Sequence, residues 1–218
     1  MNTVNTCAIL QKKDEKMFEF KKCMTDDEKE FPGLYEIQCK KSGDVRGAFF
    51  EVYSERIFFD AGLKVKFVQD NQSVSVKGVL RGLHFQTRHP QGKLVRAAAG
   101  CIFDVALDLR NGSPTFGKYH GIVLDGEKQN QLYIPEGFAH GFYVLSDTAI
   151  FSCKCTDFYD KEGEGGIIWN DSTLSIDWNC GTGKKNLLIS KKDAALPGFD
   201  IEKKYFDTSG KWIGGTSL

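Results

Sequence analysis

The chain reads Lys93-Leu94-Val95-Arg96-Ala97-Ala98 and then Cys101-Ile102-Phe103-Asp104-Val105-Ala106-Leu107-Asp108-Leu109. Short runs of this kind, rich in β-branched and aromatic residues, recur from residue 34 onward and alternate with Gly, Asp and Asn. Turn residues return about every 8 to 15 positions, close to the spacing of an all-β sandwich or barrel. The other runs are 48–53, 65–68, 74–76, 119–124, 131–134, 141–145 and 149–155.

Helical periodicity is weak, and only residues 54–61 and 191–195 are candidates for short helices. The pattern therefore predicts an all-β fold, an antiparallel double-sheet jelly roll with a few short helices. Histidines on the inward faces of such a barrel would line a pocket in its mouth.

The first part of the chain has a different composition. It carries the charged runs Lys12-Lys13-Asp14-Glu15-Lys16 and Asp26-Asp27-Glu28-Lys29-Glu30, which predict a solvated surface. Met17-Phe18-Glu19-Phe20 lies between them and is a candidate short strand. We expect an N-terminal extension over residues 1–33 and a jelly-roll domain with a C-terminal tail over residues 34–218.

The composition excludes several classes of protein. Lys+Arg and Asp+Glu both number 29, and a zero net charge argues against a protein that binds nucleic acid by neutralising phosphates. The seven cysteines form no CxxC pair, which is typical of a reduced cytoplasmic protein. The start does not resemble a signal peptide, and no apolar run approaches the roughly 20 residues that span a bilayer. We expect a cytoplasmic protein without a membrane segment.

Three motifs contain candidate site residues: Arg81-Gly82-Leu83-His84-Phe85-Gln86, Gly92-Lys93, and Pro135-Glu136-Gly137-Phe138-Ala139-His140-Gly141. They hold two of the four histidines, and no His-x-His pair accompanies them. Histidine and lysine without such a pair indicate proton transfer beside a carbonyl, with no metal or other cofactor. Cys153 and Cys155, the one close cysteine pair, would face the same side of a strand. No second ligand pair completes a zinc set around them.

In these motifs the chain resembles the dTDP-4-dehydrorhamnose 3,5-epimerase family, nucleotide-sugar epimerases with a metal-free cupin jelly roll. The resemblance runs from about Gly43 to Pro197, and the length and order of the matching strings make it specific. The strings are 67–71, 78–86, 92–96, 103–106, 113–117 and 134–142.

The resemblance implies a reaction as well as a cupin-like fold. An enzyme of this family inverts C3, C5 or both in a nucleotide-linked 4-keto-6-deoxy sugar, by proton abstraction next to the ketone. This chemistry belongs to deoxysugar or surface-polysaccharide biosynthesis. The implied partners are a nucleotide-diphosphate sugar and a second copy of the chain, since the family forms dimers by exchange of N-terminal strands.

The resemblance also assigns roles. His84 would be the base, because an imidazole with a pKa of about 6.5 accepts protons near neutral pH, and Asp193 would orient it. Lys93 would stabilise the enolate, His140 would contact the sugar and Arg81 would hold the diphosphate. The other matching positions of the nucleotide site are Arg46, Glu51, Gln69, Asn71, Tyr159, Glu164 and Lys192. Without the resemblance, a structural role for His84 as a core histidine is as well supported as a role as the base. The sequence alone also leaves open that Arg81 forms an ion pair at the surface.

One position departs from the family pattern: the family's acid is a tyrosine, and Cys153 stands in its place. In a first interpretation Cys153 is the acid itself, because a thiol (pKa about 8.5) is a stronger acid than a phenol (pKa about 10). Alternatively, the acid is lost, so that one centre inverts or water supplies the proton. In a third interpretation the protein only binds a nucleotide sugar, or catalyses a keto-isomerisation. Tyr143 would replace the acid only if a bulge turned it to the face of His140.

Overall fold

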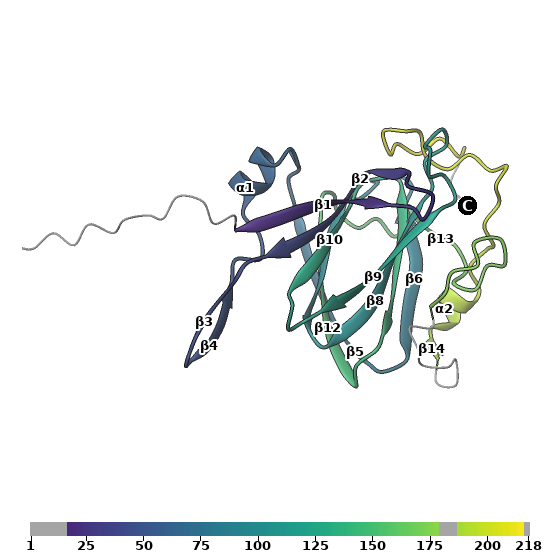
Figure 1. Cartoon of the computed structure of the whole chain (residues 1–218). Helices are drawn as coiled ribbons and strands as arrows, with labels where there is room; N and C mark the ends of the chain where they lie inside the picture. Colours follow the sequence, from purple (N-terminus) through teal and green to yellow (C-terminus); the bar gives the residue numbers. More distant parts are fainter. Residues whose placement is uncertain (1–16, 179–186, 216–218) are drawn as a thin grey trace, which may run out of the picture.

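The computed structural model describes residues 17–178 and 187–215, and these form two facing β-sheets (Figure 1). The first sheet is antiparallel throughout. In spatial order it consists of β1 (Phe18–Met24), β2 (Glu30–Cys39), β10 (Asn130–Ile134), β7 (Lys93–Ala99), β12 (Thr148–Cys155) and β5 (Gln69–Val76).

The second sheet faces the first and has one parallel strand at its margin. In spatial order it consists of β13 (Glu164–Gly166), β6 (Val79–Gln86), β11 (Phe138–Val144), β8 (Cys101–Asp108) and β9 (Tyr119–Asp125), with β14 (Leu188–Ile189) parallel to β6. The helices are α1 (Glu55–Asp60) and α2 (Lys191–Ala194). The arrangement confirms the predicted all-β, cupin-like double-sheet jelly roll with short helices. Neither helix of the described chain is long and apolar enough to cross a membrane.

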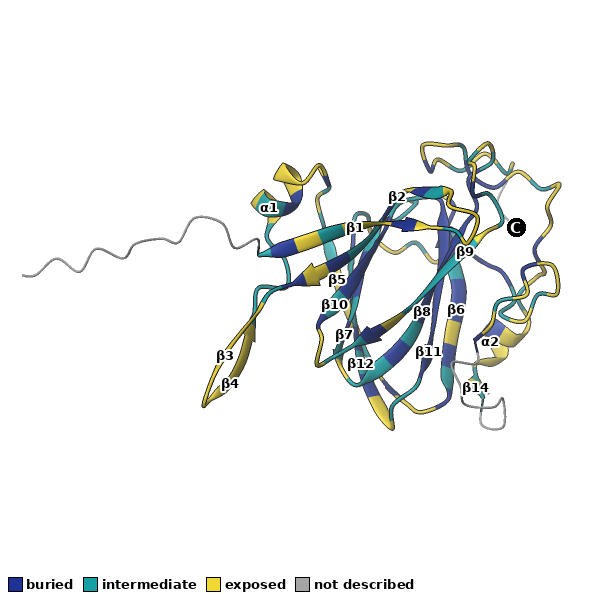
Figure 2. Ribbon diagram, in the orientation of Figure 1, coloured by how far each residue is buried: buried dark blue, intermediate teal, exposed yellow. Residues whose placement is uncertain are grey.

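The second sheet is covered on both faces, which explains the burial along its central strands (Figure 2). All residues of β11 and most of β8 are buried, because one face meets the first sheet and the other meets C-terminal segments. Trp178, Phe199 and Phe206 supply large apolar side chains to this outer layer. The space between the sheets is therefore the place where polar inward-facing side chains have to find partners or line a cavity.

The sequence pattern predicted most strands, but the strand expected over residues 65–68 was wrong. The strand begins only at Gln69, and of the residues before it Val68 donates a backbone hydrogen bond to the Cys155 carbonyl of β12 at 2.9 Å. Val65 and Phe67 pack instead into a cluster beside α1, where the Phe67 ring lies 5.2 Å from that of Tyr53. Apolar residues in this run therefore serve a local cluster and not a sheet.

The N-terminal part that the structure describes is joined to the barrel by strand pairing. β1 pairs with β2, and β2 pairs with β10, so both strands extend the first sheet. The candidate strand at residues 17–20 is confirmed within β1. The expected boundary between residues 33 and 34 lies inside β2, and the division of the chain into two parts stays a prediction.

A separate hairpin leaves the body of the molecule. β3 (Lys41–Asp44) and β4 (Gly47–Phe50) pair only with each other and project away from the two sheets (Figure 1). Two of its apolar side chains are exposed, Val45 at the tip and Phe49 along β4. A two-stranded hairpin is marginally stable by itself, and Phe50 at its base packs against the apolar cluster beside α1.

Candidate active site

A cavity of about 810 Å³ lies between the sheets and is open at one end. This volume is within the range of about 300–1,000 Å³ that small-molecule sites occupy. Its wall contains most of the residues that the sequence analysis predicted for the site: Asn71, Arg81, His84, Lys93, His140, Cys153, Tyr159, Glu164, Lys192 and Asp193. Arg46, Glu51 and Gln69 do not line it. The structure thus brings together side chains from β5, β6, β7, β11, β12, β13 and α2.

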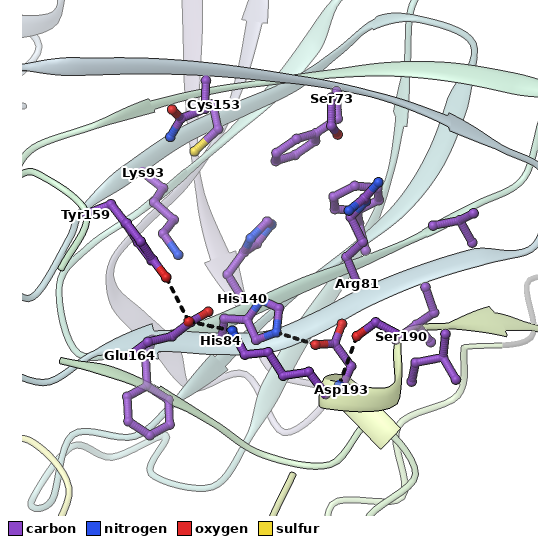
Figure 3. Close-up of a pocket in the computed structure, with 18 of the residues that line it drawn as sticks. Ser73, Arg81, His84, Lys93, His140, Cys153, Tyr159, Glu164, Ser190 and Asp193 are labelled. Atoms are coloured by element: carbon purple, nitrogen blue, oxygen red, sulfur yellow. Dashed lines mark hydrogen bonds and ion pairs between the residues drawn. The ribbon is translucent and has the colours of Figure 1, made fainter. Parts of the chain in front are cut away.

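His84 and Asp193 form a hydrogen-bonded pair on one wall of the cavity (Figure 3). His84 Nε2 lies 2.9 Å from Asp193 Oδ1, although the two residues are 109 positions apart. The Asp193 carboxylate is buried, and its Oδ2 accepts a second hydrogen bond from the Gly82 amide at 3.3 Å. Ser190 caps α2 by accepting a hydrogen bond from the Asp193 amide at 3.0 Å. The short helix therefore fixes the carboxylate that orients the imidazole.

The environment of His84 favours the neutral imidazole. Burial lowers the pKa of His84 below its ordinary value of 6.5, although the Asp193 carboxylate acts in the opposite direction. Lys93 adds to the lowering through its charge. A neutral ring that is held by a carboxylate can accept a proton on its other nitrogen, which is the requirement for a general base.

A bulge in β6 allows Arg81 and His84 to face the same cavity. The two residues are three positions apart, so a regular strand would place them on opposite faces. In the pairing with β11, His84 lies opposite His140 but Arg81 lies opposite Phe142, which shows one extra residue in β6. Gly82 has a φ of +122°, and a Cβ there would lie 2.5 Å from the Gly141 Cα. Glycine is therefore required at both positions for the close approach that accompanies the bulge.

His140 is held by a buried carboxylate that the sequence analysis missed. Its Nε2 lies 2.8 Å from Oδ2 of Asp104, which is 0% exposed. The His140 ring also stacks on Phe151 at 5.7 Å. A signal was present in the sequence, because Asp104 is a charged residue inside an otherwise apolar strand run. These contacts fix the second histidine of the cavity in a single orientation.

Lys93 extends from the start of β7 into the middle of the cavity, between Cys153 and the His84 pair (Figure 3). Its charge lowers the pKa of His84 on one side and of Cys155 on the other. A cation in this position can stabilise negative charge that develops on a bound molecule.

Polar side chains form the rim of the cavity. The Tyr159 hydroxyl donates to Glu164 Oε2 at 2.9 Å, and Lys192 forms an ion pair with the same carboxylate. Burial raises the pKa of Glu164, but Lys192 and Tyr159 outweigh it and lower that pKa overall. Gln69 supports this rim from outside, because its Oε1 accepts from the Tyr159 amide at 3.1 Å. Arg81 donates to the neutral Ser75 hydroxyl at 3.2 Å.

Cys153 lies across the cavity from His84 and Asp193 (Figure 3). Its Sγ is 3.6 Å from that of Cys155, and both side chains line the wall. The sequence predicted both cysteines on one face of a strand, but no role for Cys155 followed from it. Tyr143 faces a different cavity of about 330 Å³ that Trp169 and Trp178 also line. The bulge is in β6 and not in β11, so Tyr143 does not replace the missing tyrosine.

Arg46 and Glu51 lie outside the cavity. Arg46 is at the turn of the β3–β4 hairpin, where its side chain is 86% exposed and bonds Asp44. Glu51 directly follows β4. The hairpin carries Arg46 away from the cavity of the same chain (Figure 1), and Glu51 at the base of the hairpin does not line that cavity.

Candidate metal ligands come together at a place remote from this cavity. Among the residues that the structure describes, Cys23, Glu36 and His120 are the one group of three with ligand atoms within 4.8 Å of one another. Their strands are β1, β2 and β9, and His120 Nε2 already contacts Glu36 Oε1 at 3.1 Å. None of these three residues lines the cavity described above.

Comparisons with known proteins assign the chain to a family. The sequence profile of the dTDP-4-dehydrorhamnose 3,5-epimerase family matches residues 28–200. A relative of that name from Pseudomonas aeruginosa is 56% identical over 163 residues, which are 74% of this chain and 88% of the relative. Another from Shigella flexneri is 51% identical over 179 residues, 81% of this chain and 96% of the relative.

A solved structure agrees with these sequence matches. The Legionella pneumophila dTDP-6-deoxy-D-glucose-3,5-epimerase, in complex with dTDP-4-keto-L-rhamnose, superimposes with a TM-score of 0.74 at 44% identity. The alignment covers 84% of this chain and 99% of that one. The family match begins at residue 28, before the first string on which the resemblance rested, and continues through α2. The chain therefore belongs to the dTDP-4-dehydrorhamnose 3,5-epimerase family.

Proposed function

We propose that the protein is an epimerase that inverts C3, C5 or both in a dTDP-linked 4-keto-6-deoxy sugar, for the biosynthesis of deoxysugars or surface polysaccharides. The observation that carries the proposal is the His84–Asp193 pair on the wall of a cavity that also holds Lys93. Family membership supports the reaction, and the dTDP-4-keto-L-rhamnose bound to the Legionella relative supports the class of substrate.

The geometry supports a stepwise proton transfer. A C–H bond beside a ketone is acidic because the carbanion delocalises onto oxygen as an enolate. His84 removes this proton, and Asp193 stabilises the imidazolium that forms. Lys93 stabilises the enolate oxygen with its fixed charge. The proton that completes the inversion has to reach the opposite face of the carbon, where we propose Cys153 as the donor.

The other cavity residues fit the nucleotide and the sugar. Arg81 is suited to the diphosphate because a guanidinium binds phosphate oxygens in a bidentate manner. His140, fixed by Asp104, is suited to a sugar hydroxyl. We assign the rim to the nucleotide, including the half-exposed Tyr159, whose ring offers a surface on which a base can stack. The remaining proposed contacts are Gln69, Asn71, Glu164 and Lys192.

The decisive experiment is incubation with dTDP-4-keto-6-deoxyglucose in deuterated water, followed by proton NMR and mass spectrometry of the sugar. An epimerase incorporates deuterium at C3, at C5 or at both, and the coupling constants report each inversion. Deuterium at one carbon would define a single-centre epimerase, and a shifted carbonyl in the carbon spectrum would define a keto-isomerase. Calorimetric binding without any exchange would define a binding protein and would contradict the proposal.

The lowered pKa of His84 gives an expectation for the acid side of the pH profile. A base works only when it is unprotonated, so lowering its pKa extends activity to lower pH. We expect no decline of kcat/KM as the pH falls through about 6.5, the ordinary histidine value, and a decline only below it. Asp193→Asn removes the carboxylate and is expected to change the pH at which this decline of kcat/KM on the acid side begins. A decline of the wild type that begins above 6.5 would show that His84 is not the base.

We propose that the protein is a homodimer in which the β3–β4 hairpin of one copy completes the cavity of the other. The support is that Arg46 and Glu51 match nucleotide-site positions but do not line their own cavity, and that the hairpin with Arg46 at its turn projects away from it. The exposed apolar Phe49 and Val45 on the same hairpin would then be covered by the partner. A symmetric pair is also the commonest assembly of soluble proteins.

Complementation between two inactive variants tests this arrangement. Arg46→Ala/Glu51→Ala retains the His84 pair, and His84→Asn retains the hairpin. After unfolding and refolding together, an equal mixture is expected to recover about a quarter of wild-type activity, because half of the dimers are mixed and each has one intact site. A mixture of His84→Asn with Asp193→Asn is the control and is expected to recover none, since both changes fall in one site. Equal recovery in the two mixtures, or none in either, would contradict the shared site.

Two further expectations remain proposals. A cytoplasmic location is supported by the free thiols of the described residues, because disulfides are rare in reducing compartments. Catalysis without a cofactor is supported by the chemistry of the cavity, since an imidazole, an ammonium group and a thiol suffice for proton transfer beside a ketone.

A further inference from the structure

Inversion requires a proton donor on the face of the sugar that is opposite His84, and few groups of the cavity can provide it. His140 is engaged with Asp104, which holds its Nε2. The Tyr159 hydroxyl lies at the rim and donates to Glu164. The strand of Glu164 pairs directly with the strand of His84, so this hydroxyl is held on the same side of the cavity as His84. The far wall carries instead the Cys153 thiol, and Cys155 lines the cavity from two positions along the same strand.

The two thiols are arranged as a pair. They project from alternate positions of β12, a strand held between β5 and β7. Their sulfur atoms are 3.6 Å apart, which is hydrogen-bond distance for thiols, and the side chains are buried except toward the cavity. Asn71 Nδ2 donates to Cys155 Sγ at 3.7 Å from the neighbouring strand. Strand pairing on both sides therefore fixes the separation of the two sulfur atoms.

We propose that Cys153 and Cys155 act as one proton-donating unit, in which Cys153 delivers the proton and Cys155 is a positioning residue that stabilises the thiolate left behind. The inference rests on the proposed epimerase function. In the step, the Cys153 S–H bond breaks and a C–H bond forms at the enolate carbon, while the electrons of the carbon–carbon double bond enter the new bond. The Cys155 S–H group then donates to the Cys153 thiolate. The imidazolium of His84 loses its proton to water, and water returns a proton to Cys153.

A second thiol is needed because of where the first one lies. A buried thiolate without a hydrogen-bond donor is costly, so a lone Cys153 would be a weak acid. Cys155 offsets this cost only while it is protonated and its S–H group is the donor of the pair; when Cys153 donates to a Cys155 thiolate instead, Cys153 holds its proton more tightly. Lys93 contributes in the same direction, because its charge is felt by both sulfur atoms.

The pair titrates as a unit, and this gives the proposal a measurable signature. The hydrogen bond from Cys153 lowers the pKa of Cys155 to about 7, while that hydrogen bond and burial raise the pKa of Cys153. The first proton is therefore lost near pH 7, and the second is retained, because two thiolates 3.6 Å apart repel each other. Only the fully protonated pair can donate and still stabilise the resulting thiolate. The rate of inversion is expected to fall as the pH rises through about 7.

The test is the pH profile of inversion in Cys155 variants. Cys155→Ala is expected to slow inversion by about 10- to 100-fold, the usual worth of a hydrogen bond to a charged group. Cys155→Ala should also move the upper limb of the profile, where the rate falls as the pH rises, to higher pH. A lone buried Cys153 keeps its proton up to a higher pH than the pair does. Cys155→Ser supplies a hydroxyl donor and is expected to recover part of the rate. Cys101→Ala, which changes a cysteine of β8 outside the cavity, is expected to leave both the rate and the profile unchanged.

Two outcomes separate failure of this inference from failure of the function. If wild-type protein incorporates no deuterium into the sugar, the epimerase proposal itself is wrong. If it does, and Cys155→Ala retains the wild-type rate and upper limb, the thiol pair is not the donor. Binding of dTDP and the thermal midpoint of each variant show whether the cavity is intact. A slower Cys155→Ala with an unshifted limb would assign Cys155 a packing role and would also overturn the inference.

Discussion

Replacing His84 with asparagine is expected to lower turnover by about 10³- to 10⁴-fold, toward the upper end of what general-base catalysis contributes. Deuterium exchange at both carbons beside the ketone should be lost together with inversion. Asparagine retains a polar group near Asp193 and fills a similar space, but it cannot take a proton from carbon. The measurement is the initial rate of exchange in deuterated water, followed by NMR.

Two matched variants show whether this loss is chemical. His89→Asn makes the same substitution at an exposed histidine that does not line the cavity, and it should leave the rate unchanged. Asp193→Asn leaves the imidazole in place without its carboxylate and is expected to cost about 10²-fold, because orientation and charge stabilisation are lost but the base remains. If His84→Asn still exchanges deuterium at the wild-type rate, another group removes the proton.

The strands of the barrel could be predicted because their pattern is local. Runs such as 101–109 and 149–155 have strand composition and turn residues at their ends, and both form strands. The run at 65–68 has the same composition but joins a cluster beside α1. Whether such a segment enters a ladder depends on the neighbours that it meets in three dimensions, which no local pattern contains.

The site was predictable only in part, because its geometry depends on long-range contacts. The resemblance placed Asp193 beside His84, and no spacing rule connects residues 109 positions apart. The bulge that turns Arg81 toward His84 depends on the packing of Gly82 against Gly141 of another strand. The direction of the β3–β4 hairpin likewise depends on tertiary packing. The sequence does not contain this direction, which places Arg46 far from its own cavity.

Cys155 shows why a comparison of motifs was not sufficient. The family pattern directs attention to Cys153, because a tyrosine is expected there. What the thiol can do depends on its distance from Cys155 and from Lys93, and these distances follow from the register of β12 against β5 and β7. A departure from a motif therefore has to be interpreted with its neighbours in space.

The second large effect is expected for Cys153→Ala, which should separate exchange from inversion. His84 and Lys93 are intact in this variant, so protons are still removed and returned on the face of His84. Deuterium should continue to enter the sugar with retention of configuration. Inversion should fall by about 10²- to 10⁴-fold, the contribution of a general acid. Proton NMR distinguishes the two results, because exchange removes a signal and inversion changes the coupling constants.

The same variant decides among the three interpretations of the missing tyrosine. Unchanged inversion in Cys153→Ala would show that water or another residue supplies the proton. A loss confined to one carbon would show that Cys153 serves only that centre. Cys153→Tyr restores the family's residue, and if its hydroxyl reaches the substrate the upper pH limb should move toward about 10, the value of a phenol. Such a shift, from a limb near 7 that Cys155 sets to one that a tyrosine sets, would identify position 153 as the source of the proton.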